Sequence, residues 1–266
     1  MLVCGAPVVE DGSMAAVDDR TDGAARGGLG TVRNAVALLE LLSEGPAYQQ
    51  LTDLAERSTF SIPTVHRLLR SLVLADLVVQ DPRSSRYALG PELTRLSSHY
   101  LARLPLLGAL TPYLTQLRDQ LGATVHVQTL VRGEVVYVDR VDGDDRGPYR
   151  DTHRVHCALE TAGGRLLAAR ADGDEWRRAV DLADDPLAAL ARDCQQAWAA
   201  ADHLALTPDD PMLPAEVAVP VLDGEGETVA ALAANVEDAG DEAVVARVAA
   251  HLSRAARAAG RTLGHA

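Results

Sequence analysis

Lysine is missing from this sequence, and aromatic residues and cysteines are scarce. All 25 basic residues are arginines, and Phe, Trp and Tyr together make up 3% of the chain. Hydrophobic residues still reach 47%, so we expect cores built from Leu, Val and Ala. The three cysteines, Cys4, Cys157 and Cys194, are odd in number and far apart. That pattern argues against a disulfide scaffold and suits a reducing compartment.

Long apolar runs are missing too. No stretch approaches the roughly 18 uninterrupted apolar residues of a membrane span, and the N-terminus lacks the basic region and apolar run of a signal peptide. We therefore expect a soluble, cytoplasmic protein with no membrane partner. At 266 residues the chain is long for one domain and sufficient for two, because a domain usually takes about 100–200 residues.

Acidic charge dominates the chain, but it is unevenly distributed. The net charge is −13 at pH 7, of which residues 104–266 carry −11 and residues 1–28 carry −3. Residues 29–103 hold eight arginines against seven acidic residues. This balance of +1 allows the segment to approach phosphates, so the overall acidity does not exclude a nucleic-acid partner.

The first third of the chain has the element order of a winged helix-turn-helix. Residues 1–28 are rich in Gly, Ala and Asp without a period, and we expect a disordered tail there. From Thr31, apolar residues recur at helical spacing until Gly45-Pro46. Two further helices and two short strands are predicted after it, at 51–57, 61–74, 77–79 and 86–89. We assign residues 29–90 to a DNA-binding domain.

The rest of the chain predicts a linker and an α+β domain. One helical stripe of leucines runs from Leu93 to Leu121 and is interrupted by Pro105 and Pro112. We therefore expect a linker helix over 91–104, a break, and a second helix. Strands and helices then follow over the remainder of 105–266, with strands at 124–131, 134–141, 149–157, 216–222 and 228–236, and helices at 163–171, 174–181, 186–201 and near the C-terminus.

The predicted helix at 61–74 separates apolar from polar residues as a recognition helix does. Its apolar residues fall in one arc at about 100° per residue, namely Ile62, Val65, Leu68, Leu69 and Leu72. Arginine on the opposite arc can bond phosphates or guanine, and threonine can meet a thymine methyl group. The DNA-binding candidates are Ser61, Thr64, His66, Arg67, Arg70 and Ser71, with Arg83 and Arg86 on the predicted hairpin.

Three groups of motifs resemble the isocitrate lyase regulator (IclR) family of bacterial transcription regulators. The first is Thr64-Val-His-Arg-Leu-Leu69 with Arg86-Tyr-Ala-Leu-Gly-Pro91. The second is Ala123-Thr-Val-His-Val127 with Glu134-Val-Val-Tyr-Val-Asp-Arg140, and the third is Val217-Ala-Val-Pro-Val-Leu-Asp223 with Val229-Ala-Ala-Leu232. The motifs follow the family's order over about residues 31–264.

The resemblance implies a ligand-responsive regulator that binds double-stranded operator DNA, with a GAF-like C-terminal effector domain. It also implies a homodimer or homotetramer, dimerised through the DNA-binding domains and linker helices. Effectors in the family are often small organic acids or aromatic compounds. The chain departs from the family at Ile62-Pro63, where many members carry Lys-Ser, so the operator sequence cannot be inherited from relatives.

The resemblance also places an effector pocket over the sheet of the C-terminal domain, beside the loop from Cys157 to Gly164. The pocket candidates are Val127, Thr129, Cys157, Thr161, Ala162, Val217, Val219 and Asn235. Residues 231–234 offer no hydroxyl group, and Glu216 would repel an anion if it faced inward. A small carboxylate depends on charge-assisted hydrogen bonds, so we expect a larger and less anionic effector.

No arrangement in the sequence points to catalysis, so we expect neither an enzyme nor a cofactor. The sequence His153-x-x-His156-Cys157 has a metal-like spacing, but on a strand its two histidines point to opposite faces and a fourth ligand is missing. We interpret it as strand residues near the pocket rim. Two alternatives stay open: a regulator whose sensor domain is degenerate, and a small-molecule enzyme or carrier with an appended interaction domain.

Overall fold

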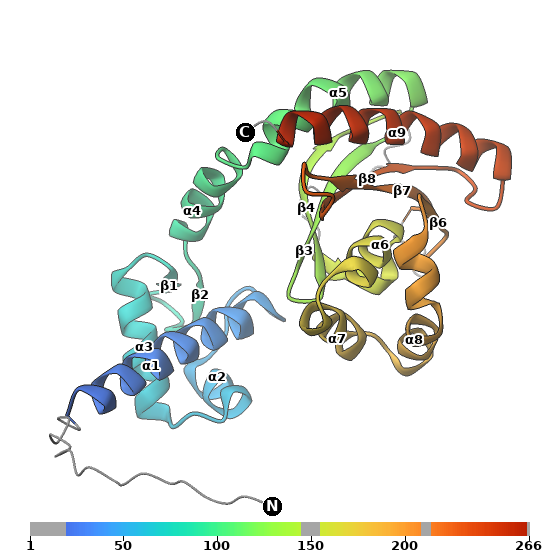
Figure 1. The fold of residues 1–266 in the computed structure, drawn as a ribbon. Coiled ribbons are helices and arrows are strands. Elements are labelled where there is room, and N and C mark those ends of the chain that lie inside the picture. Colours follow the sequence, from blue (N-terminus) through green and yellow to red (C-terminus); the bar gives the residue numbers. More distant parts are fainter. Residues whose placement is uncertain (1–19, 145–154, 209–213, 265–266) are drawn as a thin grey trace, which may run out of the picture. The chain divides into compact units, whose positions relative to one another are not determined.

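The computed structural model describes residues 20–144, 155–208 and 214–264. The chain divides into two compact units, and the boundary falls between His99 and Tyr100. The first unit contains three helices followed by a two-stranded hairpin (Figure 1). Its elements are α1 (Arg20–Ser43), α2 (Leu51–Ser58), α3 (Ile62–Leu74), β1 (Val78–Gln80) and β2 (Tyr87–Leu89).

A single apolar core holds the first unit together. Leu38, Leu54, Leu69 and Val65 are each 0% exposed and pack with the side chains of the hairpin. The end of α1 is tied to this core through Gln49, whose amide donates to the carbonyl oxygens of Leu41 and Glu44 at 2.9 and 2.7 Å. These bonds satisfy carbonyl groups that the end of a helix leaves without partners.

Helix α1 starts earlier than the sequence predicts. It begins at Arg20, so residues 20–28, expected within a disordered tail, are helical; residues 1–19 lie outside the described residues. Glycine at four positions between 20 and 30 hid this extension from sequence reasoning. A helix that packing has already nucleated gains one backbone hydrogen bond for each residue it adds.

The leucine stripe forms two helices, α4 (Glu92–Leu101), which contains the boundary, and α5 (Pro105–Leu121), which belongs to the second unit. Pro105 stands in the first turn of α5, where a missing N–H costs nothing. Pro112, however, lies inside α5 and does not break it. The burial of Leu110, Leu114 and other α5 residues outweighs the lost hydrogen bond. The predicted order of linker helix, break and second helix is found, with the break directly before Pro105.

The second unit is built on a six-stranded antiparallel sheet in the order β5-β4-β3-β8-β7-β6. Its strands are β3 (Val125–Val131), β4 (Glu134–Val141), β5 (Val155–Cys157), β6 (Leu204–Leu206), β7 (Glu216–Leu222) and β8 (Thr228–Asn235). Strand β6 was not predicted. Of the strand expected at 149–157, residues 149–154 lie outside the described residues.

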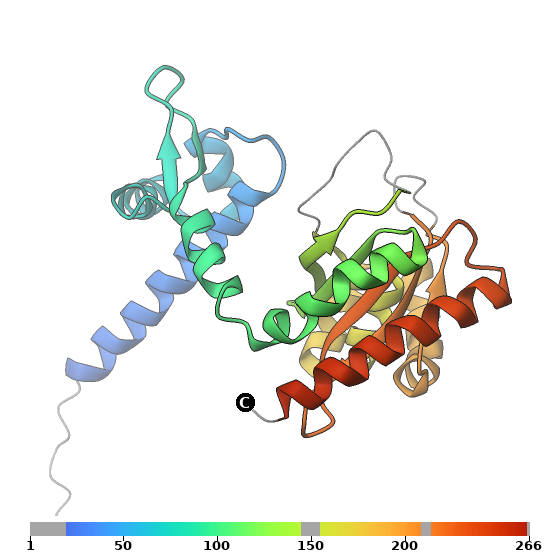
Figure 2. The same ribbon diagram turned by 90° about the horizontal axis from the view of Figure 1, so that it is seen from above.

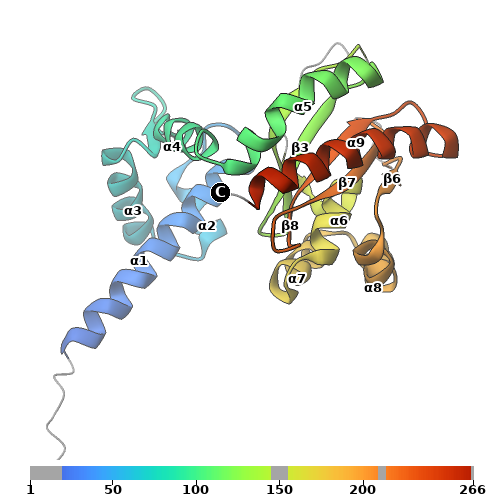
Figure 3. The ribbon, with the colours of Figure 1, turned by 45° about the horizontal axis from the view of Figure 1, so that its top comes forward.

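Different helices cover the two faces of the sheet (Figure 3). Helix α5 and the terminal helix α9 (Glu242–Leu263) pack on one face, which we call the α9 face. Helix α6 (Ala162–Arg170) packs on the other, the α6 face, with a short 3-10 turn at Ala158–Glu160 before it. Helices α7 (Gly173–Leu182) and α8 (Asp185–Ala200) lie beside α6. Among the described residues, none of the helices combines the length and apolar character that a membrane crossing requires.

Candidate recognition helix and sensor face

Helix α3 presents the division of faces that the sequence predicts. Val65, Leu68, Leu69 and Leu72 are buried in the core of the first unit, whereas the side chains on the opposite arc are exposed, namely His66, Arg67, Arg70 and Ser71. Within the described residues, the guanidinium groups of Arg67 and Arg70 make no hydrogen bond or ion pair that would hold them on the protein surface. The outer arc of α3 therefore carries two cations available to an anionic partner.

Ile62 is an exception to the predicted apolar arc. It is 55% exposed, because it is the first residue of α3 and lies one turn before the buried Val65. Ser61 caps this end from an extended conformation, and its hydroxyl lies 2.9 Å from the hydroxyl of Thr64. The Ser71 hydroxyl donates to the Arg67 carbonyl oxygen at 3.2 Å. Three of the DNA-binding candidates thus already have local partners.

The hairpin of β1 and β2 forms a wing (Figure 2). One aspartate, Asp81, organises its tip. The Asp81 carboxylate accepts hydrogen bonds from the backbone N–H of Arg83 and Ser84 at 3.2 and 3.0 Å, and from the Ser84 hydroxyl. The Ser84 hydroxyl and these backbone amides lower the pKa of Asp81. Arg83 and Arg86 are both exposed on this fixed tip.

The predicted effector residues do not come together. Val127, Val217 and Val219 are at most 1% exposed and lie in the core of the α9 face. Thr129 lines a hollow near the start of α5. Thr161 caps the N-terminus of α6 by accepting from Gly164 N at 2.9 Å, and Ala162 packs on the α6 face. The expected grouping of the three valines with Thr161 and Ala162 is therefore not found.

The α6 face carries a polar row that sequence reasoning missed. Residues directly opposite each other in an antiparallel pair share a face, and the strand register places six polar side chains on this one. We call them the polar row: His126, Gln128, Tyr137, His156, Glu216 and Asn235. The His126 and Tyr137 rings meet edge to face at 5.1 Å, and those of Tyr137 and His156 at 6.0 Å.

Glu216 sits at one end of the polar row and binds the start of α6. It is 3% exposed, and its Oε1 accepts from Gly163 N at 3.1 Å. Its Oε2 accepts from Gln128 Nε2 at 3.1 Å and lies 3.4 Å from His126 Nε2. The Ala162 amide also donates to this carboxylate. The sequence indicated only that Glu216 would repel an anion; in the folded chain its carboxylate accepts hydrogen bonds from the first amides of α6.

Opposing effects act on the ionisation of Glu216. Burial, the largest effect, raises the pKa of its carboxyl group because a low-dielectric surrounding disfavours charge. The interaction with His126 and the hydrogen bonds from the Gly163 and Ala162 amides act the other way and outweigh it, so the pKa lies below the ordinary value of 4.5. Glu216 is therefore an ionised carboxylate held inside the protein at neutral pH.

Some buried atoms of the polar row have no hydrogen-bond partner among the described residues. They include Gln128 Oε1 and His126 Nδ1, on side chains that are 0% and 2% exposed. A Cβ atom on Gly163 would overlap Gln128 Oε1, so glycine at this position allows α6 to approach the row closely. Buried polar atoms normally have partners, so these two atoms could each accept or donate a further hydrogen bond.

Of the metal-like spacing, His156 joins the polar row, whereas the Cys157 thiol faces α7. The Cys157 thiol donates to the Ala179 carbonyl oxygen at 3.8 Å, and burial raises its pKa. It therefore packs against α7 as a protonated thiol. His153 lies outside the described residues, and within those that are described no group of three or more His, Cys, Asp and Glu side chains could hold a metal ion.

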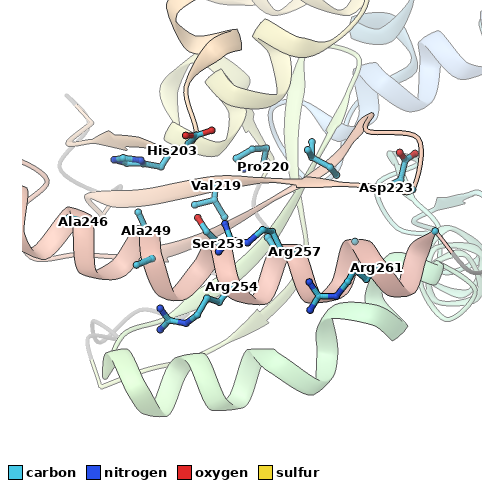
Figure 4. Close-up of a pocket in the computed structure, with 17 residues that line it drawn as sticks. His203, Val219, Pro220, Asp223, Ala246, Ala249, Ser253, Arg254, Arg257 and Arg261 are labelled. Atoms are coloured by element: carbon cyan, nitrogen blue, oxygen red, sulfur yellow. The ribbon is translucent and has the colours of Figure 1, made fainter.

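A separate groove of about 1010 Å³ lies between α9 and strand β7 (Figure 4). Arg254, Arg257 and Arg261 project from α9 near it, and Asp223 and His203 lie on its other side. Of the predicted effector residues only Val219 lines this groove. It is open and mostly lined by exposed side chains, unlike the buried polar row.

Comparison with known proteins matches residues 31–82 to the IclR helix-turn-helix domain. The chain is 31% identical over 140 residues to the glycerol operon regulatory protein of Streptomyces coelicolor, which covers 52% of this chain and 55% of that protein. The chain spans about half the length of the first curated relatives it matches.

Solved structures extend the likeness to both units. A transcriptional regulator of IclR type from Silicibacter is 22% identical with a TM-score of 0.73, over 88% of this chain and 96% of that one. An IclR homologue from Microbacterium hydrocarbonoxydans, solved in complex with 4-hydroxybenzoate, is 18% identical with a TM-score of 0.61, over 89% and 100%. The fold is thus α+β with an N-terminal winged helix-turn-helix, as the sequence predicts.

Proposed function

We propose that this chain, whose residues 31–82 match the IclR helix-turn-helix domain, is a transcription regulator of the IclR type that binds operator DNA and responds to a small molecule. The observation that carries the proposal is the outer arc of α3, where Arg67 and Arg70 stand exposed within the matched domain. We propose that α3 enters the major groove and that Arg83 and Arg86 on the wing touch the backbone or the minor groove. Repression is the expected sign of regulation.

The remaining polar candidates support this placement by their position. Thr64 and His66 lie on or beside the outer arc, and Ser61 and Ser71 lie at its two ends. Their hydroxyl groups already have local partners, and such groups can still accept or donate a further bond to phosphate. A protein that works on DNA in this way is expected in the cytoplasm.

The chain is proposed to act as a homodimer, or as a tetramer of paired dimers. One module covers only a short half-site, so two-fold symmetry is needed for useful specificity. Helix α4 has no buried residue, and Leu96 is 47% exposed on it. On α1, Val32 and Val36 are 66% and 40% exposed. These apolar side chains fit a dimer interface formed by α1 and α4.

The effector site is proposed on the α6 face, beside Thr161, Ala162 and Asn235. Asn235 stands directly opposite Glu216 in the register of β7 and β8, and the α6 N-terminus is next to both. The homologue solved with 4-hydroxybenzoate supports effector binding in proteins of this fold. Val127, Val217 and Val219 would then pack on the opposite, α9 face of the sheet and would not contact the effector.

The test is retention of DNA by the purified chain over a series of salt concentrations, followed by a footprint on its own upstream DNA. A regulator should protect a two-fold symmetric site, and its affinity should fall steeply with salt because each phosphate contact releases counterions. Weak, salt-independent retention with no protected site would refute the proposal and favour an enzyme or carrier with an appended interaction domain.

A further inference from the structure

The N-terminus of α6 has no amide left for a ligand. Glu216 accepts from the Ala162 and Gly163 amides, and the Thr161 hydroxyl accepts from the Gly164 amide. The next amide, that of Arg165, donates to the Thr161 carbonyl oxygen at 3.0 Å. The donors that make a helix N-terminus attractive to anions are therefore all occupied by groups of the chain itself.

The occupant of this position is a carboxylate. Glu216 is ionised and buried, and Gln128 Nε2 and His126 Nε2 approach the oxygen that the helix does not bind. Around it, Gln128 Oε1 and His126 Nδ1 are buried without partners among the described residues. The amides of α6, Gln128 and His126 thus surround the Glu216 carboxylate as such groups surround a bound carboxylic acid.

We propose that Glu216 is a built-in replacement for an anionic effector and determines the specificity of the sensor site. Its carboxylate fills the anion position at the start of α6, so a free carboxylate is excluded by occupancy and by charge. The effector of the wild-type chain is then an uncharged or cationic molecule. This inference rests on the proposed effector site. It also gives a structural reason why the effector should not be a small organic acid.

The same geometry predicts that removing the carboxylate creates an acid site. Truncation of Glu216 to alanine deletes a CH₂ group and a carboxylate, which together match acetate. The amides of Ala162 and Gly163 and the side chains of Gln128 and His126 would remain. Acetate should therefore bind the Glu216→Ala variant in the place of the deleted atoms.

Thermal unfolding at pH 7 with increasing acetate tests this. Acetate should raise the Tm of Glu216→Ala saturably, and at 100 times its Kd it should favour the folded state about 100-fold. Wild type, the isosteric Glu216→Gln and the exposed-turn variant Glu225→Ala should show no saturable shift, and sodium chloride should not replace acetate. If Glu216→Ala does not fold, Glu216→Ser opens the same position and is used instead.

Two outcomes would overturn the inference. One is a folded Glu216→Ala or Glu216→Ser protein whose Tm responds to acetate no more than that of wild type. The other is saturable binding of acetate, glyoxylate or pyruvate to wild type by calorimetry. Neither measurement requires DNA. The Glu216 inference can therefore fail while operator binding is observed, and the effect of acetate on Tm can be measured even if operator binding is not found.

Discussion

Arg67 and Arg70 give the most direct access to the proposed DNA-binding surface. Both are exposed on the outer arc of α3, and within the described residues neither guanidinium group has a protein partner to lose. Alanine is the strongest helix former, so Arg67→Ala and Arg70→Ala should leave the first unit folded. Arg177→Ala is the matched control, because Arg177 is an exposed arginine of the second unit with only a surface ion pair to Asp174.

The size of the effect depends on what each side chain touches. An arginine that reads a base should cost about 1–3 kcal/mol when removed, which is roughly 5- to 150-fold in affinity for the operator but not for unrelated DNA. An arginine that touches only phosphate should weaken both alike. It should also reduce the slope of log K against log salt by about 0.9 per contact, or about 1.8 for a dimer on two half-sites.

Fluorescence anisotropy with the footprinted site and a scrambled duplex, each over a salt series, separates these cases. Circular dichroism of each variant shows whether the fold is kept. If the double variant binds the operator as tightly as wild type and with the same salt slope, α3 is not the recognition helix. If Arg177→Ala weakens binding equally, net charge explains the effect and the assignment to α3 fails.

Three further predictions concern stability and assembly. Leu69→Ala should lower the free energy of unfolding of the first unit by about 2–5 kcal/mol, because Leu69 is 0% exposed, whereas Leu74→Ala, at 84% exposed, should change it by less than about 0.5 kcal/mol in chemical denaturation; equal effects would contradict the core. The lowered pKa of Glu216 stabilises the fold above pH 4.5, and this stabilisation is lost as the pH falls through its folded pKa. Glu216→Gln should therefore be less stable than wild type at pH 7 and approach it in acid; a constant difference across the pH range would exclude this role. Leu96→Glu should shift sedimentation toward the 28.2 kDa monomer, and a wild type that is already monomeric at micromolar concentration, with and without DNA, would contradict dimerisation through α1 and α4.

Periodicity alone located nearly every element, because long apolar stripes and alternating strands leave little choice of structure. The strand Glu134–Val141 was predicted with its observed bounds, and the faces of α3 followed from helical spacing. The strand at Leu204–Leu206 was missed because three residues are too few to show a period. The beginning of α1 was missed because glycine-rich composition argued against a helix that packing further along the chain sustains.

The sensor site could be predicted only in part, since a strand's period identifies two faces but not which helix covers each. Val127 and His126 alternate along β3, and Val127 was assigned to the pocket because the family resemblance places a pocket over this sheet. The folded chain instead places Val127 in the α9 core and His126 beneath α6. The alternation of His126 and Gln128 with two buried valines was the available signal, because a sheet covered on both faces seldom has a polar side.

The exposure of α4 has a consequence for its stability. A helix of ten residues with no buried residue gains little beyond its own backbone hydrogen bonds, and isolated helices shorter than about 12–15 residues are marginal in water. The order of α4 should therefore depend on its burial, and in the proposed dimer the formation of α4 would be linked to chain concentration. Dilution of the chain should melt this link before either unit unfolds, which would leave two folded domains joined by a coil.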